Sequence, residues 1–204
     1  MSNFITFEGG EGTGKSTQIN LLGERLKKLG RTVVITREPG GSPQAEDLRT
    51  LLVSGDTDRW SAESEALLNY AARDSHLNQL IRPALATGSI VLCDRFMDST
   101  RAYQGYAGAC TFHLLDELEL AIVGTTRPTL TLIFDLEPVV GLARANARGG
   151  GAEDRFERKG LAFHQRLRDG FLDIAKQEPG RCRVVDASKD IETVAAQVWS
   201  FVNG

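Results

Sequence analysis

The sequence predicts an α/β fold of three layers, in which a parallel sheet of five strands is flanked by helices. Short apolar runs rich in β-branched residues alternate with longer stretches of helical period. Each short run is almost continuously hydrophobic, as is typical of strands that are covered on both faces. Polar and glycine-rich clusters follow the runs directly, at the carboxyl edge where such sheets bind ligands.

The individual elements follow from these patterns in chain order. Strands are expected at residues 4–7, 32–36, 89–93, 130–134 and 183–185. Helices are expected where apolar residues recur at helical spacing, at residues 19–29, 62–86, 163–176 and 191–201. Gly30, directly after the first of these helices, is a typical stop signal.

Length and composition favour a single globular domain spanning residues 1–204. The chain is 41% hydrophobic and 25% charged, and we find no internal repeat or linker that would divide it. The formal net charge of -3 argues against a general attraction to nucleic acid. An anionic ligand would therefore have to be bound by a local cluster of arginines.

The cysteines indicate a reducing compartment. Cys93, Cys110 and Cys182 are odd in number and far apart, so we expect free thiols and neither disulfides nor a zinc site. The N-terminus lacks a signal-peptide pattern, and no apolar run approaches the roughly 20 residues that span a bilayer. We therefore expect a cytoplasmic protein without membrane or nucleic-acid partners.

A glycine-rich loop lies between the first expected strand and the first expected helix. Its sequence GGEGTGKST contains the full pattern G-x-x-x-x-G-K-S. In such loops the backbone N–H groups surround phosphate oxygens, the lysine reaches the β- and γ-phosphates, and the serine hydroxyl binds Mg²⁺. The loop predicts binding of a nucleoside triphosphate, in the first place ATP, by Gly9, Gly10, Glu11, Gly12, Thr13, Gly14, Lys15, Ser16 and Thr17.

The phosphate loop alone does not choose between switch GTPases, motor-like ATPases and small kinases. A switch would need a guanine-reading N-K-x-D segment and a D-x-x-G segment after a strand. The chain has neither, and ASKD at residues 187–190 is only a partial match. A small kinase would instead need a second site for an anionic acceptor.

The pair Asp94-Arg95 at the end of the third strand fits a two-substrate site. Asp94 is placed to hold the metal together with Ser16, and it is a better candidate than Asp135, which also ends a strand. Arg95 is hard to explain in a switch, but it is well explained if a second phosphate must be bound.

Other arginines extend this prediction. Arg37 and Arg49 flank the expected second site, and Arg73 lies on the long central helix. Arginine binds phosphate with a planar fork. Residues 144–157 contain three successive glycines flanked by charges, which predicts a mobile lid. Its arginines Arg148 and Arg155 are expected to reach the phosphates when the lid closes and excludes water.

Together these motifs resemble the thymidylate kinase family, of the bacterial type, over nearly the whole chain. The stretches that carry the resemblance are FEGGEGTGKST (7–17), TREPGGS (36–42), DRFMDSTRAYQG (94–105), RPTLTLIFDLEPVVGLARA (127–145) and DRFE (154–157). The resemblance implies a P-loop kinase fold, a homodimer, and transfer of a phosphoryl group from ATP to dTMP with Mg²⁺, for dTTP synthesis. A kinase for another nucleoside monophosphate is the alternative.

The resemblance also implies roles for residues at matching positions. Catalysis is assigned to Lys15, Arg95 and the lid arginines Arg148 and Arg155, because Gly12 stands where the other type of the family has an arginine. The dTMP site is assigned to Glu11, Arg37, Pro39, Arg49, Asn69, Arg73, Arg95, Ser99, Tyr103 and Gln104. A tyrosine against C2′ of the sugar would disfavour a 2′-hydroxyl group.

Two positions leave alternatives open. Asn69 stands where the family has a phenylalanine that stacks on thymine, so either Asn69 hydrogen-bonds the base or the neighbouring Tyr70 stacks on it. Glu11 matches the family's acidic position facing the 3′-hydroxyl of the acceptor. It could instead only hydrogen-bond neighbouring amides or arginines.

Overall fold

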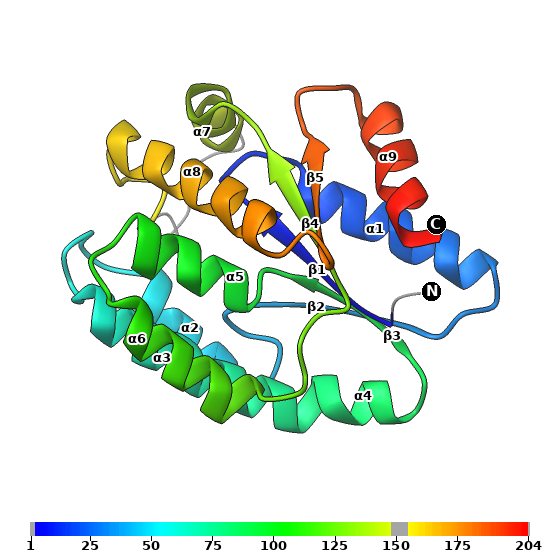
Figure 1. The fold of residues 1–204 in the computed structure, drawn as a ribbon, viewed down its shortest axis with the longest axis horizontal. Helices are drawn as coiled ribbons and strands as arrows, with labels where there is room; N and C mark the ends of the chain where they lie inside the picture. The colour runs from blue at the N-terminus through cyan, green and yellow to red at the C-terminus, as the bar shows by residue number, and fades with distance from the viewer. Residues whose placement is uncertain (1–2, 148–154, 204) are drawn as a thin grey trace.

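A parallel sheet forms the centre of the molecule (Figure 1). The computed structural model describes residues 3–147 and 155–203. The strand order is β2-β3-β1-β4-β5, and all neighbouring pairs are parallel. The strands are β1 (Phe4–Gly9), β2 (Val33–Arg37), β3 (Ile90–Asp94), β4 (Leu130–Asp135) and β5 (Cys182–Asp186). Because the strands are parallel, the segments that follow them meet at one edge of the sheet.

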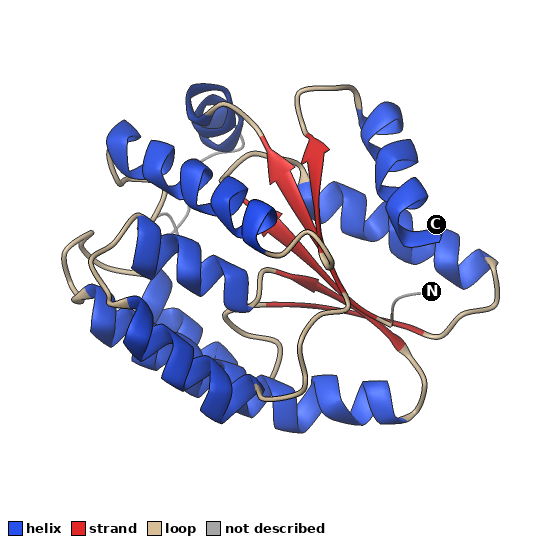
Figure 2. Ribbon diagram, viewed as in Figure 1, coloured by secondary structure: helices blue, strands red, loops and turns tan. Residues whose placement is uncertain are grey.

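Helices cover both faces of this sheet (Figure 2). On one face lie α1 (Lys15–Lys28) and α9 (Ile191–Asn203). The other helices are α2 (Pro43–Val53), α3 (Ala62–His76), α4 (Arg82–Ala86), α5 (Met97–Thr100), α6 (Phe112–Leu118), α7 (Pro138–Ala147) and α8 (Leu161–Gln177). No helix of the described residues is long and apolar enough to cross a membrane.

Three π-helical turns extend α-helices. They are η1 (Leu77–Ile81) after α3, η2 (Arg101–Tyr106) after α5 and η3 (Glu119–Val123) after α6. Such turns occur frequently at functional sites, because they change the direction of the side chains that follow. The turn η2 carries Tyr103 and Gln104, both expected at the acceptor site.

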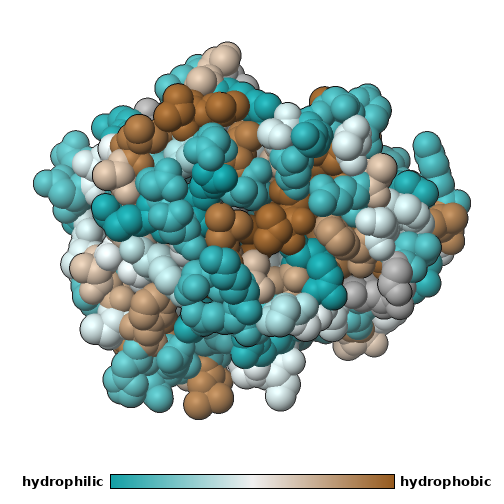
Figure 3. Space-filling view, turned by 45° about the horizontal axis from the view of Figure 1, so that its top comes forward, coloured by the Kyte–Doolittle hydropathy of each residue, from teal (hydrophilic) through white to brown (hydrophobic). Residues whose placement is uncertain are grey.

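The hydrophobic core lies on both faces of the sheet, which explains why the strands read as continuous apolar runs. On one face, Phe7 of β1 packs with Leu22 of α1 and Val198 of α9. On the other face, Tyr70 of α3 and Phe96 after β3 belong to a second buried cluster. The outer surface is mixed: Figure 3 shows apolar groups in brown separated by polar side chains in teal.

The expected fold class and strands are confirmed. The strands β2 and β3 each begin and end one residue later than expected, and β1 continues to Gly9. The expected helix at 62–86 is present as α3, η1 and α4 without a break. The short helices α2 and α6 lie outside the expected set, because eleven and seven residues carry little periodic signal.

Candidate active site

The phosphate loop connects β1 to α1 and has the backbone that its glycines permit. Gly12 and Gly14 have positive φ angles of 67° and 84°. A Cβ atom on Gly12 would lie 2.0 Å from the carbonyl oxygen of Gly141 in α7, so no larger residue fits there without a backbone shift. The glycine in place of an arginine is therefore also required by packing.

The ammonium group of Lys15 is hydrogen-bonded to three groups of the phosphate loop itself. Its Nζ donates to the carbonyl oxygens of Gly9 (3.1 Å) and Gly10 (2.7 Å) and to Oγ1 of Thr13 (3.2 Å). Burial lowers the pKa of Lys15 to about 8, and the nearby charge of Arg95 adds to this effect. The ammonium group is thus held where it can exchange these neutral partners for phosphate oxygens.

A cavity of about 160 Å³ lies in front of the loop. The side of the loop from Glu11 to Thr17 lines it, together with Arg37, Glu38, Arg49, Asp94 and Arg95. Gly9 and Gly10 do not line this cavity, although both were predicted to bind ATP. Their carbonyl oxygens accept the hydrogen bonds of Lys15.

The predicted metal ligands face each other beside this cavity. Oγ of Ser16 donates to Oδ2 of Asp94 at 3.1 Å, and Oδ1 of Asp94 is buried without a hydrogen-bond partner in the described chain. Two hard oxygen ligands next to a phosphate site fit Mg²⁺, which takes few protein ligands and completes its shell with phosphate and water. Asp135 is engaged elsewhere, in a bidentate pair with Arg168.

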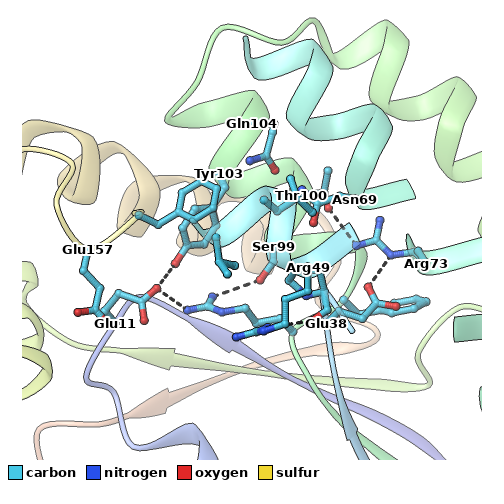
Figure 4. A pocket seen from close by; sticks show the side chains of 16 residues that line it. Glu11, Glu38, Arg49, Asn69, Arg73, Ser99, Thr100, Tyr103, Gln104 and Glu157 are labelled. Atoms are coloured by element: carbon cyan, nitrogen blue, oxygen red, sulfur yellow. Dashed lines mark hydrogen bonds and ion pairs between the residues drawn. The ribbon is translucent and has the colours of Figure 1, made fainter. Parts of the chain in front are cut away.

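A second cavity, of about 330 Å³, adjoins the first (Figure 4). It is lined by nine of the ten residues predicted to bind dTMP: Glu11, Pro39, Arg49, Asn69, Arg73, Arg95, Ser99, Tyr103 and Gln104. The exception is Arg37, which is absent from this cavity, lies at the phosphate cavity and pairs with Glu46 at 3.0 Å. We call this second space the acceptor cavity.

Arg95 stands between the two cavities and lines both. Its Nη1 donates to the Gly9 carbonyl oxygen at 2.8 Å, and its Nη2 donates to Oε1 of Glu11 at 2.8 Å. The backbone of Arg95 has a positive φ of 67°, an unusual conformation for a side chain of this size. Strain of this kind is found where a side chain must be aimed, here at the border of the two cavities.

Glu11 lines both cavities and is held by partners on both sides. Its Oε1 accepts from Arg95 and from the Tyr103 hydroxyl group at 2.6 Å. Burial favours the neutral carboxyl, but the charges of Arg95 and Lys15 outweigh it and lower the pKa of Glu11 to about 2. The contact with Arg95 agrees with the interpretation that Glu11 hydrogen-bonds a neighbouring arginine. Glu11 also faces the acceptor cavity, as its alternative role at the 3′-hydroxyl group requires (Figure 4).

Glu8, three residues earlier, has the opposite electrostatic behaviour. It is fully buried, and its carboxyl accepts from the Phe96 N–H at 2.8 Å and from Oγ of Ser99 at 2.5 Å. Burial, with a contribution from Asp98, raises the pKa of Glu8 to about 8. Through these two bonds Glu8 holds the turn that carries Arg95.

Arg73 is fixed in the wall of the acceptor cavity by a buried network. Its Nε donates to Oε2 of Glu38 at 2.8 Å, and its Nη2 donates to Oγ1 of Thr100 at 3.0 Å. The other oxygen of Glu38 is 3.0 Å from Nδ1 of His76, whose Nε2 is 2.7 Å from Oγ1 of Thr36. Nη1 of Arg73 is buried and has no hydrogen-bond partner among the described residues, and Arg73 itself lines this cavity.

The structure decides between Asn69 and Tyr70. Asn69 lines the acceptor cavity, whereas Tyr70 is 1% exposed and belongs to the core, where its ring lies under Arg73 at 4.5 Å. Stacking of Tyr70 on a base is therefore wrong. The ring of Phe96 lines the cavity, but it too is covered by Arg73, at 5.1 Å.

Arg155 departs from the predicted catalytic role. It is 0% exposed, and it lines neither of the two cavities. Its guanidinium group donates to the carbonyl oxygens of Leu52, Asp56 and Thr57 and pairs with Glu65 at 2.7 Å. With its donors used in this way, Arg155 ties the segment after residue 154 to α2 and α3. Arg148, the other predicted lid arginine, lies outside the described residues.

Several residues of the acceptor cavity are absent from the predicted set. They are Glu38, Leu52, Val53, Phe96, Thr100, Phe156 and Glu157. Glu38, Phe96, Thr100, Phe156 and Glu157 lie inside the quoted motifs, so the motifs themselves were a signal. Leu52 and Val53 end α2 and carry no signal of their own, because only packing brings this helix end to the cavity.

Comparison with known proteins agrees with this geometry. The family model described as thymidylate kinase matches residues 7–198. The chain is 59% identical to the thymidylate kinase of Caulobacter vibrioides, with 98% of this chain and 95% of that protein covered, and 54% identical to that of Nitrobacter hamburgensis, with 97% and 86% covered. The crystal structure of thymidylate kinase from Ehrlichia chaffeensis superposes with a TM-score of 0.80 at 37% identity, and 98% of each chain is covered.

The fold and the two adjoining cavities define a P-loop nucleoside-monophosphate kinase, in which one cavity meets the triphosphate and the other the acceptor. Within that class, the matching family model and the identities above show that the chain belongs to the thymidylate kinase family.

Proposed function

We propose that the chain transfers the γ-phosphoryl group of ATP to dTMP in the presence of Mg²⁺, with the two cavities as donor and acceptor sites. Phosphorylation of dTMP is the activity of the family to which the chain belongs. The observation that supports the arrangement most strongly is Arg95, which lines both cavities and borders the phosphate loop. A group held by Arg95 lies beside the place where the γ-phosphoryl group would sit.

On the donor side, the loop amides and Lys15 bind the phosphates of ATP. Mg²⁺, held by Ser16 and Asp94, would supply positive charge to the phosphate oxygens. Lys15 stabilises the charge on the transferred group, which is the main task of a protein in this reaction. Arg148 is proposed as the lid arginine, since Arg155 is engaged in the α2–α3 tie.

On the acceptor side, Arg95 and Arg49 hold the phosphate of dTMP, and the deeper part of the cavity holds thymine. Arg73 offers its Nη1 to the base, while Tyr103 and Glu11 lie on the sugar side. The acceptor phosphate is already an anion at neutral pH, since the second pKa of such a monoester is about 6. The residues therefore need to position the acceptor and need no strong general base.

A turnover assay across dTMP, dUMP, UMP, CMP and AMP tests this proposal, with ADP release as the readout. We expect dTMP to have the highest kcat/KM and ribonucleotides to be poor acceptors. Equal turnover of CMP or AMP would instead support a kinase for another nucleoside monophosphate.

The protein is further proposed to act as a homodimer. Leu67 on α3 and Leu120 on η3 are 51% and 72% exposed, on neighbouring helical segments. Large apolar groups exposed together are typical of a surface that is covered by a partner. We expect light scattering to show a dimer for the unmodified chain and a monomer for Leu120→Glu. Val139→Glu, at a position 62% exposed on α7, is the matched control and should stay dimeric.

Action in the cytoplasm is proposed for the same molecule. Cys93, Cys110 and Cys182 are buried free thiols, which suits a reducing compartment. Fractionation of cells that express a tagged chain tests this proposal, and recovery in a membrane or secreted fraction would contradict it.

A further inference from the structure

Glu65 lies directly behind the acceptor cavity and contacts a residue that lines it. The Glu65 side chain is 3% exposed and is not part of the cavity wall. Its Oε2 accepts a hydrogen bond of 2.8 Å from Nε2 of Gln104, which does line the cavity. Gln104 is therefore held from behind by a residue that no substrate would touch.

Two cationic side chains lie against the carboxylate of Glu65. Nη2 of Arg155 is 2.7 Å from Oε1 of Glu65, and Nζ of Lys159 is 3.8 Å from the same oxygen. Arg155 is itself fixed by bonds to three main-chain carbonyl oxygens, so this cation cannot move away without breaking them. A carboxylate flanked by two cations accepts hydrogen bonds and donates none.

This arrangement fixes which way the Gln104 amide faces. An acceptor-only carboxylate can bond to the NH₂ group of the amide but not to its oxygen. The amide oxygen Oε1 must then face away from Glu65, toward the cavity into which the Gln104 amide is directed (Figure 4).

Asn69 follows the same rule. Its Nδ2 donates to the main-chain carbonyl oxygen of Glu65 at 2.8 Å, so its oxygen is the end left for the cavity. This part of the cavity thus offers two amide oxygens as acceptors, and the unpartnered Nη1 of Arg73 is a donor beside them.

This pattern distinguishes pyrimidine bases. Thymine and uracil carry a donor at N3–H beside an acceptor at O4, which matches an amide oxygen beside an arginine. Cytosine carries an acceptor at N3 and a donor at N4. Its N3 would therefore face the amide oxygen, another acceptor, and its N4 amino group would face the arginine, another donor. A site that leaves polar groups unpaired rejects the wrong ligand strongly.

From this geometry we infer that Glu65, held by Arg155, is the positioning residue that makes the cavity select bases with an N3–H group against cytosine. Its charge sets the orientation of the Gln104 amide, and the amide oxygen then reads the base. The inference rests on the proposed placement of the base in the acceptor cavity, and it adds a residue that does not contact the substrate.

The variant Glu65→Gln tests the orientation directly. Its carbonyl oxygen stays with the Arg155 cation, so its NH₂ group faces Gln104. Two NH₂ groups cannot bond, and the Gln104 amide turns its own NH₂ group into the cavity. We expect the ratio of kcat/KM for dTMP to that for dCMP to fall roughly 10- to 100-fold, mainly through the two KM values.

Three further variants separate orientation from general damage. Glu65→Gln combined with Gln104→Glu again places an acceptor oxygen in the cavity and should restore most of the ratio. Glu65→Gln in a Gln104→Met background should not change the ratio further. Glu63→Gln, the same substitution in the first turn of α3, is the matched control and should keep the ratio of the unmodified enzyme.

Each outcome has a distinct meaning. Equal losses for dTMP and dCMP in Glu65→Gln, with the ratio unchanged, overturn the inference and leave only a structural role. If Glu65→Gln does not fold, Gln104→Met decides alone: an unchanged ratio overturns the inference, and a lowered ratio supports it. An unmodified enzyme that does not phosphorylate dTMP would overturn the proposed function itself.

Discussion

The phosphate loop and the acceptor cavity adjoin each other but are built in different ways. On the donor side, seven of the twelve residues that line the cavity come from one continuous stretch, residues 11–17. The acceptor cavity takes its walls from α2, α3, α5, η2, the segments after β1, β2 and β3, and the segment before α8. Its side chains already bond to one another, as in the network of Arg73, Glu38 and Thr100.

The difference follows from what each side has to recognise. Phosphates are alike in every nucleotide, so a loop of N–H groups with one lysine is sufficient. A base must be told from other bases, and this requires donors and acceptors in fixed directions. Fixed directions need supporting residues such as Glu38 and Glu65, which stand behind Arg73 and Gln104.

The largest effect is expected on the donor side. Lys15→Ala removes the one cation of the loop, and we expect kcat to fall about 10³-fold, or about 4 kcal/mol of transition-state stabilisation. Steady-state kinetics with ATP and dTMP measure this. Lys28→Ala, at the other end of α1, is the control and should retain normal turnover. Turnover near normal in Lys15→Ala would remove this lysine from the mechanism.

Loss of the ion pair between Arg155 and Glu65, behind the acceptor cavity, should lower the free energy of unfolding. Arg155→Met leaves the buried carboxylate of Glu65 without its main cation, and removal of one partner of a buried pair costs about 3–5 kcal/mol. Urea denaturation measures the free energy of unfolding. Arg158→Met, in the same segment but exposed, should cost much less. A stable Arg155→Met protein with low kcat would return Arg155 to the catalytic residues.

A smaller effect is expected when the positive charge at position 95 is kept but the planar guanidinium group is lost. Arg95→Lys retains a cation between the cavities, but it cannot bond at once to Glu11, the Gly9 carbonyl oxygen and a phosphate. We expect kcat/KM for dTMP to fall about 10- to 100-fold, judged by the loss of one or two charged hydrogen bonds. Arg31→Lys is the control, and equal kcat/KM in both variants would mean that the fork geometry is unimportant.

The smallest effect concerns the buried Glu8 of β1 and the pH dependence of stability. The pKa of Glu8 is raised from 4.5 to about 8, so between these values the folded protein keeps a proton that the unfolded chain releases. The contribution of Glu8 to the free energy of unfolding must therefore fall as the pH rises through this window. We expect Glu8→Gln to have a flatter pH profile of stability there. A profile with the same slope as the unmodified protein would show that Glu8 is not the titrating group.

How much of the site could be predicted depended on how local its parts are. Ser16 and Asp94 face each other as predicted, because each lies in a motif next to a strand end. The burial of Arg155 could not be predicted, because its neighbours Leu52 and Glu65 are remote in sequence and nothing in the letters DRFE shows that they bury it. Tyr70 directly follows Asn69 in α3, and only the packing of this helix shows which of the two side chains faces the cavity.

The sequence by itself determined the fold class, the phosphate loop and the family resemblance, since alternating apolar runs and short motifs are local properties of the chain. The tertiary structure alone decided how the acceptor cavity is supported. It brought Glu65 from α3, Gln104 from η2 and Arg155 from beyond residue 154 into one buried chain of charge and hydrogen bonds. The direction of an amide group depends on the atoms around it, and those atoms meet only when the chain is folded.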